Sequence, residues 1–133
     1  MDMNGKLLLA NCPKCNESKG EKFISTILNK YKITYIAQYK IDECKNINTL
    51  PFDFAIYDKD NNLKFLIEYD GIQHYKAISY FGGYKALKSN KKRDKIKTEY
   101  CKKNRISLIR ISYWEFENIE KIVLKKLWRE NLI

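Results

Sequence analysis

Acidic side chains stand inside two apolar stretches of this 133-residue chain, where an unpaired carboxylate is costly to bury. Asp53 lies between two phenylalanines, and Glu68 and Asp70 close an apolar run that begins at Leu63. Three carboxylates that approach one another repel unless a cation lies among them, and all-oxygen ligand sets favour Mg²⁺, Mn²⁺ or Ca²⁺. The pattern predicts a divalent-metal site for Mg²⁺ or Mn²⁺. The alternative is that these acids are solvated at strand ends, since Asp70-Gly71 is also a common turn dipeptide.

A β-hairpin would bring these carboxylates together. Residues 52–57 and 63–70 are predicted strands on either side of a polar turn at 58–62. Because side chains alternate along a strand, Glu68 and Asp70 should share one face, and Asp53 should point away from both neighbouring phenylalanines. The three acids would then converge at one end of the hairpin. Their mutual repulsion should raise at least one carboxylate pKa when no metal is bound.

The rest of the hydrophobic pattern predicts three helices and two further strands. The predicted elements are helix 18–31, strand 33–39, a polar loop at 40–50, the hairpin, an ambiguous stretch at 72–87, helix 88–104, strand 107–112 and helix 117–129. The order α-β-β-β-α-β-α indicates an α/β fold with a mixed sheet of three or four strands flanked by helices. We expect an irregular, cysteine-containing segment at residues 1–17 and one domain at residues 18–133.

Two short runs carry a family resemblance. Pro51-Phe52-Asp53 followed by Ile67-Glu68-Tyr69-Asp70-Gly71 resembles the signature of the PD-(D/E)XK nuclease superfamily, which has the restriction-endonuclease-like fold. The run from Glu68 to His74 is more specifically similar to the branch related to very-short-patch repair and phage-type homing endonucleases. The resemblance spans about residues 20–112. It implies a Mg²⁺-dependent endonuclease that hydrolyses phosphodiester bonds in DNA, with Asp53 and Glu68 as the central metal ligands.

The chain departs from the superfamily at one position, because Asp70 stands where the signature has a lysine. In some branches the basic residue comes from the following helix, and Lys97 offers that here, one helical turn from Asp94. Gln73 and His74 are the other candidates for this role, since Gln73 could position water or a phosphate.

Two further residues are candidates for the same site, each with a structural alternative. His74 is the only histidine, and its pKa near neutrality suits a general acid or base. A lone histidine is also often structural. Glu21 matches the acidic residue that the superfamily often carries on its first helix. The alternative for Glu21 is a capping box with Ser18, in which its carboxylate bonds back to the Ser18 backbone.

The charge balance points to a polyanionic partner. The chain has 26 Lys and Arg against 16 Asp and Glu, a formal net charge of +10, and neutralised phosphates release condensed counterions. The basic residues of the predicted helix 88–104 are the candidate contacts to DNA, whether duplex or branched; a solvated helix face is the alternative. Those expected to contact nucleic acid are Lys88, Lys91, Lys92, Arg93 and Lys95.

A homodimer would serve to cut both strands of a duplex. The rival function is a non-catalytic nucleic-acid-binding module that retains the nuclease fold.

The cysteines leave several possibilities open. Cys12 and Cys15 form half of a zinc knuckle, but a structural Zn²⁺ needs four ligands. Cys44 and Cys101 could complete the site, or another chain could; a degenerate finger, plain buried thiols and a Cys pair that recruits a partner are the alternatives.

No apolar run is long enough to span a membrane, and residues 6–10 are too short for a secretory signal core. We therefore expect an intracellular protein of the cytoplasm or nucleus, neither secreted nor membrane-bound.

Overall fold

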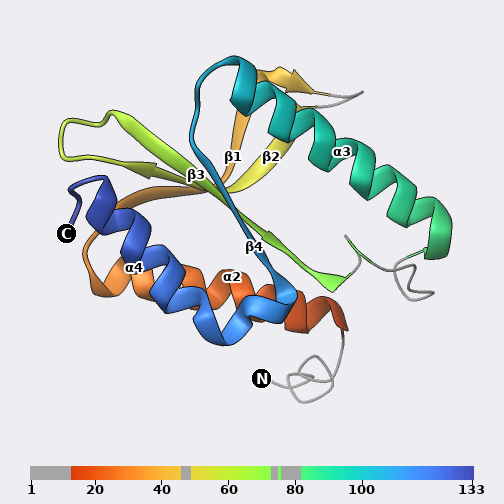
Figure 1. Cartoon of the computed structure of the whole chain (residues 1–133), viewed down its shortest axis with the longest axis horizontal. Helices are drawn as coiled ribbons and strands as arrows, with labels where there is room; N and C mark the ends of the chain where they lie inside the picture. Colours follow the sequence, from red (N-terminus) through yellow and green to blue (C-terminus); the bar gives the residue numbers. More distant parts are fainter. Residues whose placement is uncertain (1–12, 46–48, 73–74, 76–81) are drawn as a thin grey trace.

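A four-stranded mixed sheet is covered by α3 on one face and by α2 and α4 on the other (Figure 1). The computed structural model describes residues 13–45, 49–72, 75 and 82–133. The elements are α2 Pro13–Lys30, β1 Thr34–Lys45, β2 Thr49–Tyr57, β3 Leu63–Asp70, α3 Gly83–Lys103, β4 Leu108–Ser112, the 3-10 helix η3 Tyr113–Asn118, and α4 Ile119–Arg129. The predicted fold class and the predicted order α-β-β-β-α-β-α are confirmed.

The strand order in the sheet is β1-β2-β3-β4. Strands β1, β2 and β3 form an antiparallel meander, whereas β4 pairs in parallel with β3. A parallel neighbour requires a crossover connection, and α3 supplies it. Strand β3 therefore lies between β2 and β4, and its side chains meet residues from both strands and from α3.

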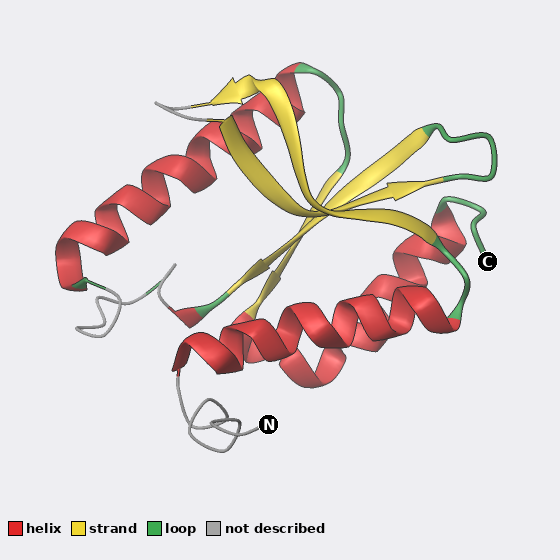
Figure 2. Ribbon diagram, turned by 180° about the vertical axis from the view of Figure 1, so that it is seen from behind, coloured by secondary structure: helices red, strands yellow, loops and turns green. Residues whose placement is uncertain are grey.

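Two apolar cores hold the layers together. The larger one packs α2 and α4 on the sheet, and Figure 2 shows these two helices side by side on that face. Its fully buried side chains include Ile24, Leu28, Phe65, Val123 and Leu127. The smaller core lies under α3 and consists of Cys44, Phe52, Ala55, Leu66 and Cys101. Among the described residues, none of the helices has the length and apolar character that crossing a membrane requires.

The first two strands are longer than predicted. Residues 40–50 were expected to be a loop, but β1 continues to Lys45 and β2 begins at Thr49. Because β1 is an edge strand that is largely exposed, polar residues are acceptable along it and conceal the strand pattern. The β1–β2 ladder continues to the pair Lys40–Pro51. Pro51 has no backbone N–H to donate, but it lies outside the part of β2 that pairs with β3, so the proline is tolerated there.

Two helices also begin earlier than predicted. Helix α2 starts at Pro13 rather than Ser18, so residues 13–17 are helical and not irregular. Proline suits the first position of a helix, because the N–H it lacks would have no intrahelical partner there. Helix α3 starts at Gly83 instead of Lys88, directly after Gly82, whose φ of 94° marks the turn into the helix. The glycine pair therefore starts a helix within the stretch 72–87 that the sequence left ambiguous.

Strand β2 changes the face of its side chains at Asp53. Strict alternation would place Phe52 and Phe54 on one face, but Phe52 belongs to the core under α3 and Phe54 to the core under α2 and α4. The expectation that Asp53 opposes both phenylalanines is therefore wrong. Opposite this point in β1, Gln38 has a left-handed φ of 53° between the pairs Ala37–Phe54 and Tyr39–Phe52. The local irregularity lets both aromatic rings reach a core while Asp53 stays between them.

Gly20 gives a direct test of how α2 meets the sheet. A Cβ at this position would lie 2.3 Å from Cζ of the buried Tyr69 ring. Alanine normally stabilises a helix interior by up to about 1 kcal/mol relative to glycine, but overpacking a core costs about 1–3 kcal/mol. We expect Gly20→Ala to lower the free energy of unfolding by about 1–2 kcal/mol in urea denaturation. The exposed Asn29→Ala in the same helix serves as the control, and a Gly20→Ala protein more stable than the parent would contradict this packing.

Candidate metal centre

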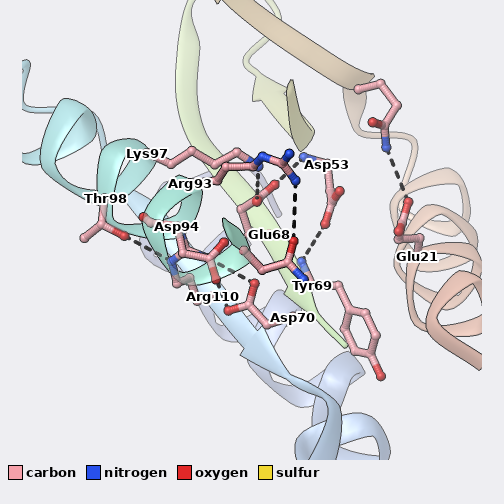
Figure 3. A network of polar contacts seen from close by, with 12 residues as sticks. Glu21, Asp53, Glu68, Tyr69, Asp70, Arg93, Asp94, Lys97, Thr98 and Arg110 are labelled. Carbon is pink, nitrogen blue, oxygen red and sulfur yellow. Dashed lines mark hydrogen bonds and ion pairs between the residues drawn. The ribbon is translucent and has the colours of Figure 1, made fainter. Parts of the chain in front are cut away.

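The carboxylate of Glu68 is buried between β2 and α3. Its side chain is 3% exposed, yet both oxygens have close donors. The backbone N–H of Asp53 donates to Oε2 at an N···O distance of 2.6 Å, and Lys97 Nζ donates to Oε1 at 2.6 Å (Figure 3). Burial raises the pKa of Glu68, and the Lys97 ammonium and the Asp53 N–H oppose that shift by favouring the charged form.

Side chains replace the backbone ladder between β2 and β3 at this point. The pairs run from Leu63–Tyr57 to Ile67–Phe54, with one register shift between Tyr57 and Ile56. Beyond them, the Asp53 N–H donates to the Glu68 carboxylate, and the Tyr69 N–H donates to Asp53 Oδ2 at 2.7 Å. Each strand therefore offers its backbone donor to a carboxylate of the other, so the two acids are fixed in register with the main chain.

The second oxygen of Asp53 has no donor among the described residues, since its carboxylate accepts only the Tyr69 N–H. Burial raises the pKa of Asp53 to about 8, with smaller upward contributions from the charges of Glu68 and Glu21. The sequence predicted a raised carboxylate pKa at this site and ascribed it to repulsion. The pKa is raised, but desolvation is the larger cause. An oxygen that is desolvated and lacks a donor is suited to binding a cation.

Arg110 of β4 joins the end of β3 to α3. Its Nη1 lies 3.0 Å from Asp70 Oδ1 and 3.6 Å from Asp94 Oδ1. Its Nη2 donates to the Asp94 carbonyl oxygen at 3.0 Å, and Nε donates to Thr98 Oγ1 at 3.2 Å. The guanidinium therefore holds one carboxylate on the strand and another on the helix. Burial lowers the pKa of Arg110, but the Asp70, Asp94 and Glu68 charges more than offset this and raise it.

Three carboxylates come close enough to hold a metal ion together. One oxygen each of Glu68, Asp70 and Asp94 lies within 4.8 Å of the others. Asp53 is a fourth acid, and the two cations Lys97 and Arg110 are bonded to the other three. When all six groups are ionised, four negative and two positive charges leave a net charge of −2. A divalent cation would balance that charge, and these residues could hold it.

Lys97 lies against Glu68. The side chain comes from α3 and is nearly buried, and its Nζ lies 5.4 Å from the centroid of the Phe52 ring as well as against Glu68. A buried ammonium is stable only with such partners. Asp70, at the position where the signature that the sequence resembles has a lysine, faces Arg110.

Glu21 faces the centre from the opposite side. Because α2 begins at Pro13, Ser18 lies inside the helix, so the alternative capping box is wrong. Gln38 Nε2 donates to Glu21 Oε1 at 3.4 Å, and the charge of Glu21 contributes to the raised pKa of Asp53. Figure 3 shows Glu21 beside Asp53, across from the α3 residues.

Several predicted site residues lie outside the described part of the chain. These are Gln73, His74 and Cys12, and the side chain of Cys15 is likewise not described. Their roles at the metal centre and at a zinc half-site therefore stay predictions. Cys44 and Cys101 are buried free thiols in the core under α3, and burial raises both pKa values, that of Cys101 to about 11.

The predicted nucleic-acid contacts lie on one exposed helix. Helix α3 carries nine Lys and Arg residues against two acids over Gly83–Lys103. All five predicted contacts are exposed: Lys88, Lys91, Lys92, Arg93 and Lys95. Lys88 and Lys91 also line a shallow pocket with Tyr84, Lys85 and Leu87. The helix thus presents basic side chains to solvent while Lys97 faces the carboxylates.

Two residues of the centre were not predicted as ligands or partners. Asp94 was noted only as the neighbour of Lys97 one turn away, and its acidic character inside a basic helix was the available signal. Arg110 gave a weaker signal, as a charge between Ile109 and Ile111 in a predicted buried strand. Its partner Asp70 becomes clear only once β4 is known to pair in parallel with β3.

Comparison with known proteins places the chain in one family. Residues 23–125 match the profile of a family described as "Protein of unknown function (DUF2726)". Invertebrate iridescent virus 6 has a similar protein, described as "Uncharacterized protein 307L", which is 40% identical over 63 residues. That match covers 47% of this chain and 32% of the viral protein, so the chain spans about a third of the length of this relative. No solved structure matches the chain significantly.

The raised pKa of Asp53 gives a pH dependence of stability without metal. The native carboxyl keeps its proton up to about pH 8, whereas the unfolded one loses it near pH ~4. Between these values the native state binds more protons, so the free energy of unfolding should fall as pH rises. Urea denaturation in EDTA from pH 5 to 8 measures this fall. Asp53→Asn should reduce it, whereas Asp60→Asn in the exposed hairpin turn should not; equal slopes for both variants would exclude the assignment.

Proposed function

The chain belongs to the DUF2726 family, and we propose that it is a metal-dependent endonuclease that hydrolyses phosphodiester bonds in DNA. The observation that carries the proposal is the pair Asp53 and Glu68. These are two desolvated carboxylates on adjacent strands, each of which accepts a backbone N–H of the other strand, and Lys97 donates to Glu68. Together with the element order, this arrangement supports the resemblance to the PD-(D/E)XK superfamily.

The donor set fits Mg²⁺ or Mn²⁺. Every candidate ligand is a carboxylate oxygen, which is the donor type that these ions prefer. Two positions that share Glu68 are available, one with Asp53 and one with Asp70 and Asp94. Arg110 already neutralises the second pair, so the first is favoured. A bound divalent ion would lower the pKa of a coordinated water and neutralise charge on the phosphate.

The protein's own cations take the part of the missing lysine. Lys97 is fixed by Glu68 beside the metal position, so its ammonium can stabilise negative charge on a phosphate oxygen. Arg110 keeps Asp70 and Asp94 from repelling that phosphate, because it is bonded to both. Glu21 could orient a water on the side of Asp53. His74 stays a predicted acid or base for this step.

Helix α3 supplies the contact to the substrate backbone. Its exposed Lys and Arg side chains lie on both sides of Lys97 in the sequence: Lys85, Lys88, Lys91, Lys92, Arg93 and Lys95 before it, and Lys102 and Lys103 after it. Basic side chains in such numbers bind phosphates without reading sequence. Because the chain has only four arginines, the usual bidentate readers of guanine, we propose a substrate that is recognised mainly through its backbone.

The first test of the proposal is cleavage. The protein should nick supercoiled plasmid in Mg²⁺ or Mn²⁺ and leave it intact in EDTA. Asp53→Ala, Glu68→Ala and Lys97→Ala should each lower the cleavage rate by at least about a hundredfold, since each removes a group that acts on the reacting phosphate. A time course on agarose gels measures the rates.

The matched control is Lys95→Ala, which removes a basic side chain from the exposed face of the same helix. It should weaken DNA binding slightly and leave the metal dependence unchanged. Cleavage by Asp53→Ala at the rate of the parent would refute the assignment. Tight binding in EDTA with no cleavage of duplex, single-stranded or branched DNA in either metal would support the non-catalytic binding module instead.

The second test is stabilisation by metal alone. A ligand that binds only the native state at a hundred times its Kd raises the free energy of unfolding by about 2.7 kcal/mol. For a domain of this size the melting temperature should rise by roughly 10 °C, because unfolding entropy is about 2.1 cal/mol/K per residue. Calorimetry in saturating Mg²⁺ or Mn²⁺ measures the shift; Zn²⁺ is avoided because it could bind cysteine.

Variants of single carboxylates locate the ion. Asp53→Asn and Glu68→Gln should abolish the melting shift if the ion lies where we propose. Asp94→Asn should leave most of it, since Asp94 belongs to the neighbouring position. The reverse result, a shift lost in Asp94→Asn and kept in Asp53→Asn, would move the ion to the Glu68, Asp70 and Asp94 cluster.

A further inference from the structure

An exposed tryptophan lies close to the carboxylates, at the end of the sheet where β3 and β4 both end. Trp114 is the second residue of η3 and is 62% exposed. Its ring centroid lies 4.6 Å from that of Tyr75 and 5.3 Å from that of Tyr113, and those two rings lie 5.8 Å apart. Three aromatic rings therefore form one cluster, which we call the Trp114 platform.

The platform is rigidly attached to the centre. The Tyr75 hydroxyl lies 2.7 Å from Ser112 Oγ and donates to Asp70 Oδ2 at 3.4 Å. Ser112 also begins η3 with a capping box, in which the Glu115 carboxylate accepts the Ser112 N–H at 3.2 Å. The tryptophan is thus one side chain removed from Asp70, and the backbone that carries it is fixed by two sets of hydrogen bonds.

We infer that the Trp114 platform stacks an unpaired nucleobase of the bound strand, so the preferred substrate has single-stranded or unpaired nucleotides beside the scissile phosphate. The inference rests on the proposed function for the nature of the ligand. A large exposed ring held in place loses little entropy when a planar ligand covers it, and every nucleobase offers a planar face. The net charge of +10 over the whole chain favours a polyanionic partner.

The two tryptophans of the chain make a matched experiment. Trp128, near the end of α4, is 69% exposed and lies about 15 Å or more along the helix from η3 at ~1.5 Å rise per residue. Trp128→Phe leaves Trp114 as the only tryptophan reporter, and Trp114→Phe leaves Trp128. In EDTA, a twelve-residue oligothymidylate should quench the emission of Trp114 and leave that of Trp128 nearly unchanged. A blunt hairpin duplex should quench Trp114 far less.

Affinity gives the second readout. At fixed salt, Trp114→Ala should weaken binding of the oligothymidylate by about five- to a hundredfold, the usual effect of removing one stacking ring. Trp128→Ala should change the affinity less than twofold. Equal affinities for both variants, or equal quenching by single strand and duplex, would overturn the inference. So would a Trp114 emission that shifts with protein concentration in the absence of DNA, which would show that a second copy of the chain covers the ring.

The two proposals fail separately. The binding measurements use EDTA and need no cleavage, so a protein that shows Trp114-specific binding without cleaving any DNA would retain the platform and lose the nuclease assignment. A protein that nicks plasmid with Asp53 dependence but shows no Trp114-specific effect would retain the nuclease and lose the platform.

Discussion

The burial of Glu68 is the constraint on which the rest of the centre depends. A carboxylate that is 3% exposed needs a donor for each oxygen, and here the donors come from two different elements. The Asp53 N–H fixes β2 against β3, and Lys97 fixes α3 over the sheet. Removing one partner would leave a buried charge, so the three elements are stabilised as a set around this side chain.

The parallel strand β4 extends the same arrangement to the end of β3. A parallel partner had to return through a crossover, and the crossover helix α3 places Lys97 against Glu68 and Asp94 against Arg110. Register places Arg110 beside Glu68 and Ser112 beside Asp70. The crossover through α3 and β4 therefore brings Lys97, Asp94 and Arg110 next to Glu68 and Asp70. In the hairpin alone, these two carboxylates would repel each other.

The apolar pattern of the sequence predicted most of the helices and strands but fewer of the contacts in the candidate metal centre. The hairpin and the helix periodicity were readable because buried strands and amphipathic helices carry apolar repeats. The polar part of β1 was missed, since an exposed edge strand needs no such repeat. The opposite faces of Phe52 and Phe54 were also missed, because the left-handed Gln38 and the carboxylate–backbone hydrogen bonds around Asp53 have no signal in the local apolar pattern. Arg110 was missed for a related reason, since only strand pairing shows what it faces.

The acid at position 70 changes the chemistry of the centre without removing its cations. A lysine at the end of β3 would bring its charge from the same strand as Glu68. Here Asp70 binds Arg110, and Lys97 reaches Glu68 from the helix. Counted with Asp53 and Asp94, the centre has four acids and the two cations Lys97 and Arg110, which leave a net charge of −2 when all six groups are ionised. A site with that net negative charge still favours a further cation when both Lys97 and Arg110 are in place. Under the proposed function, binding of a divalent ion and of a phosphate would therefore be coupled more tightly here than at a site where a lysine on the same strand already supplies the positive charge.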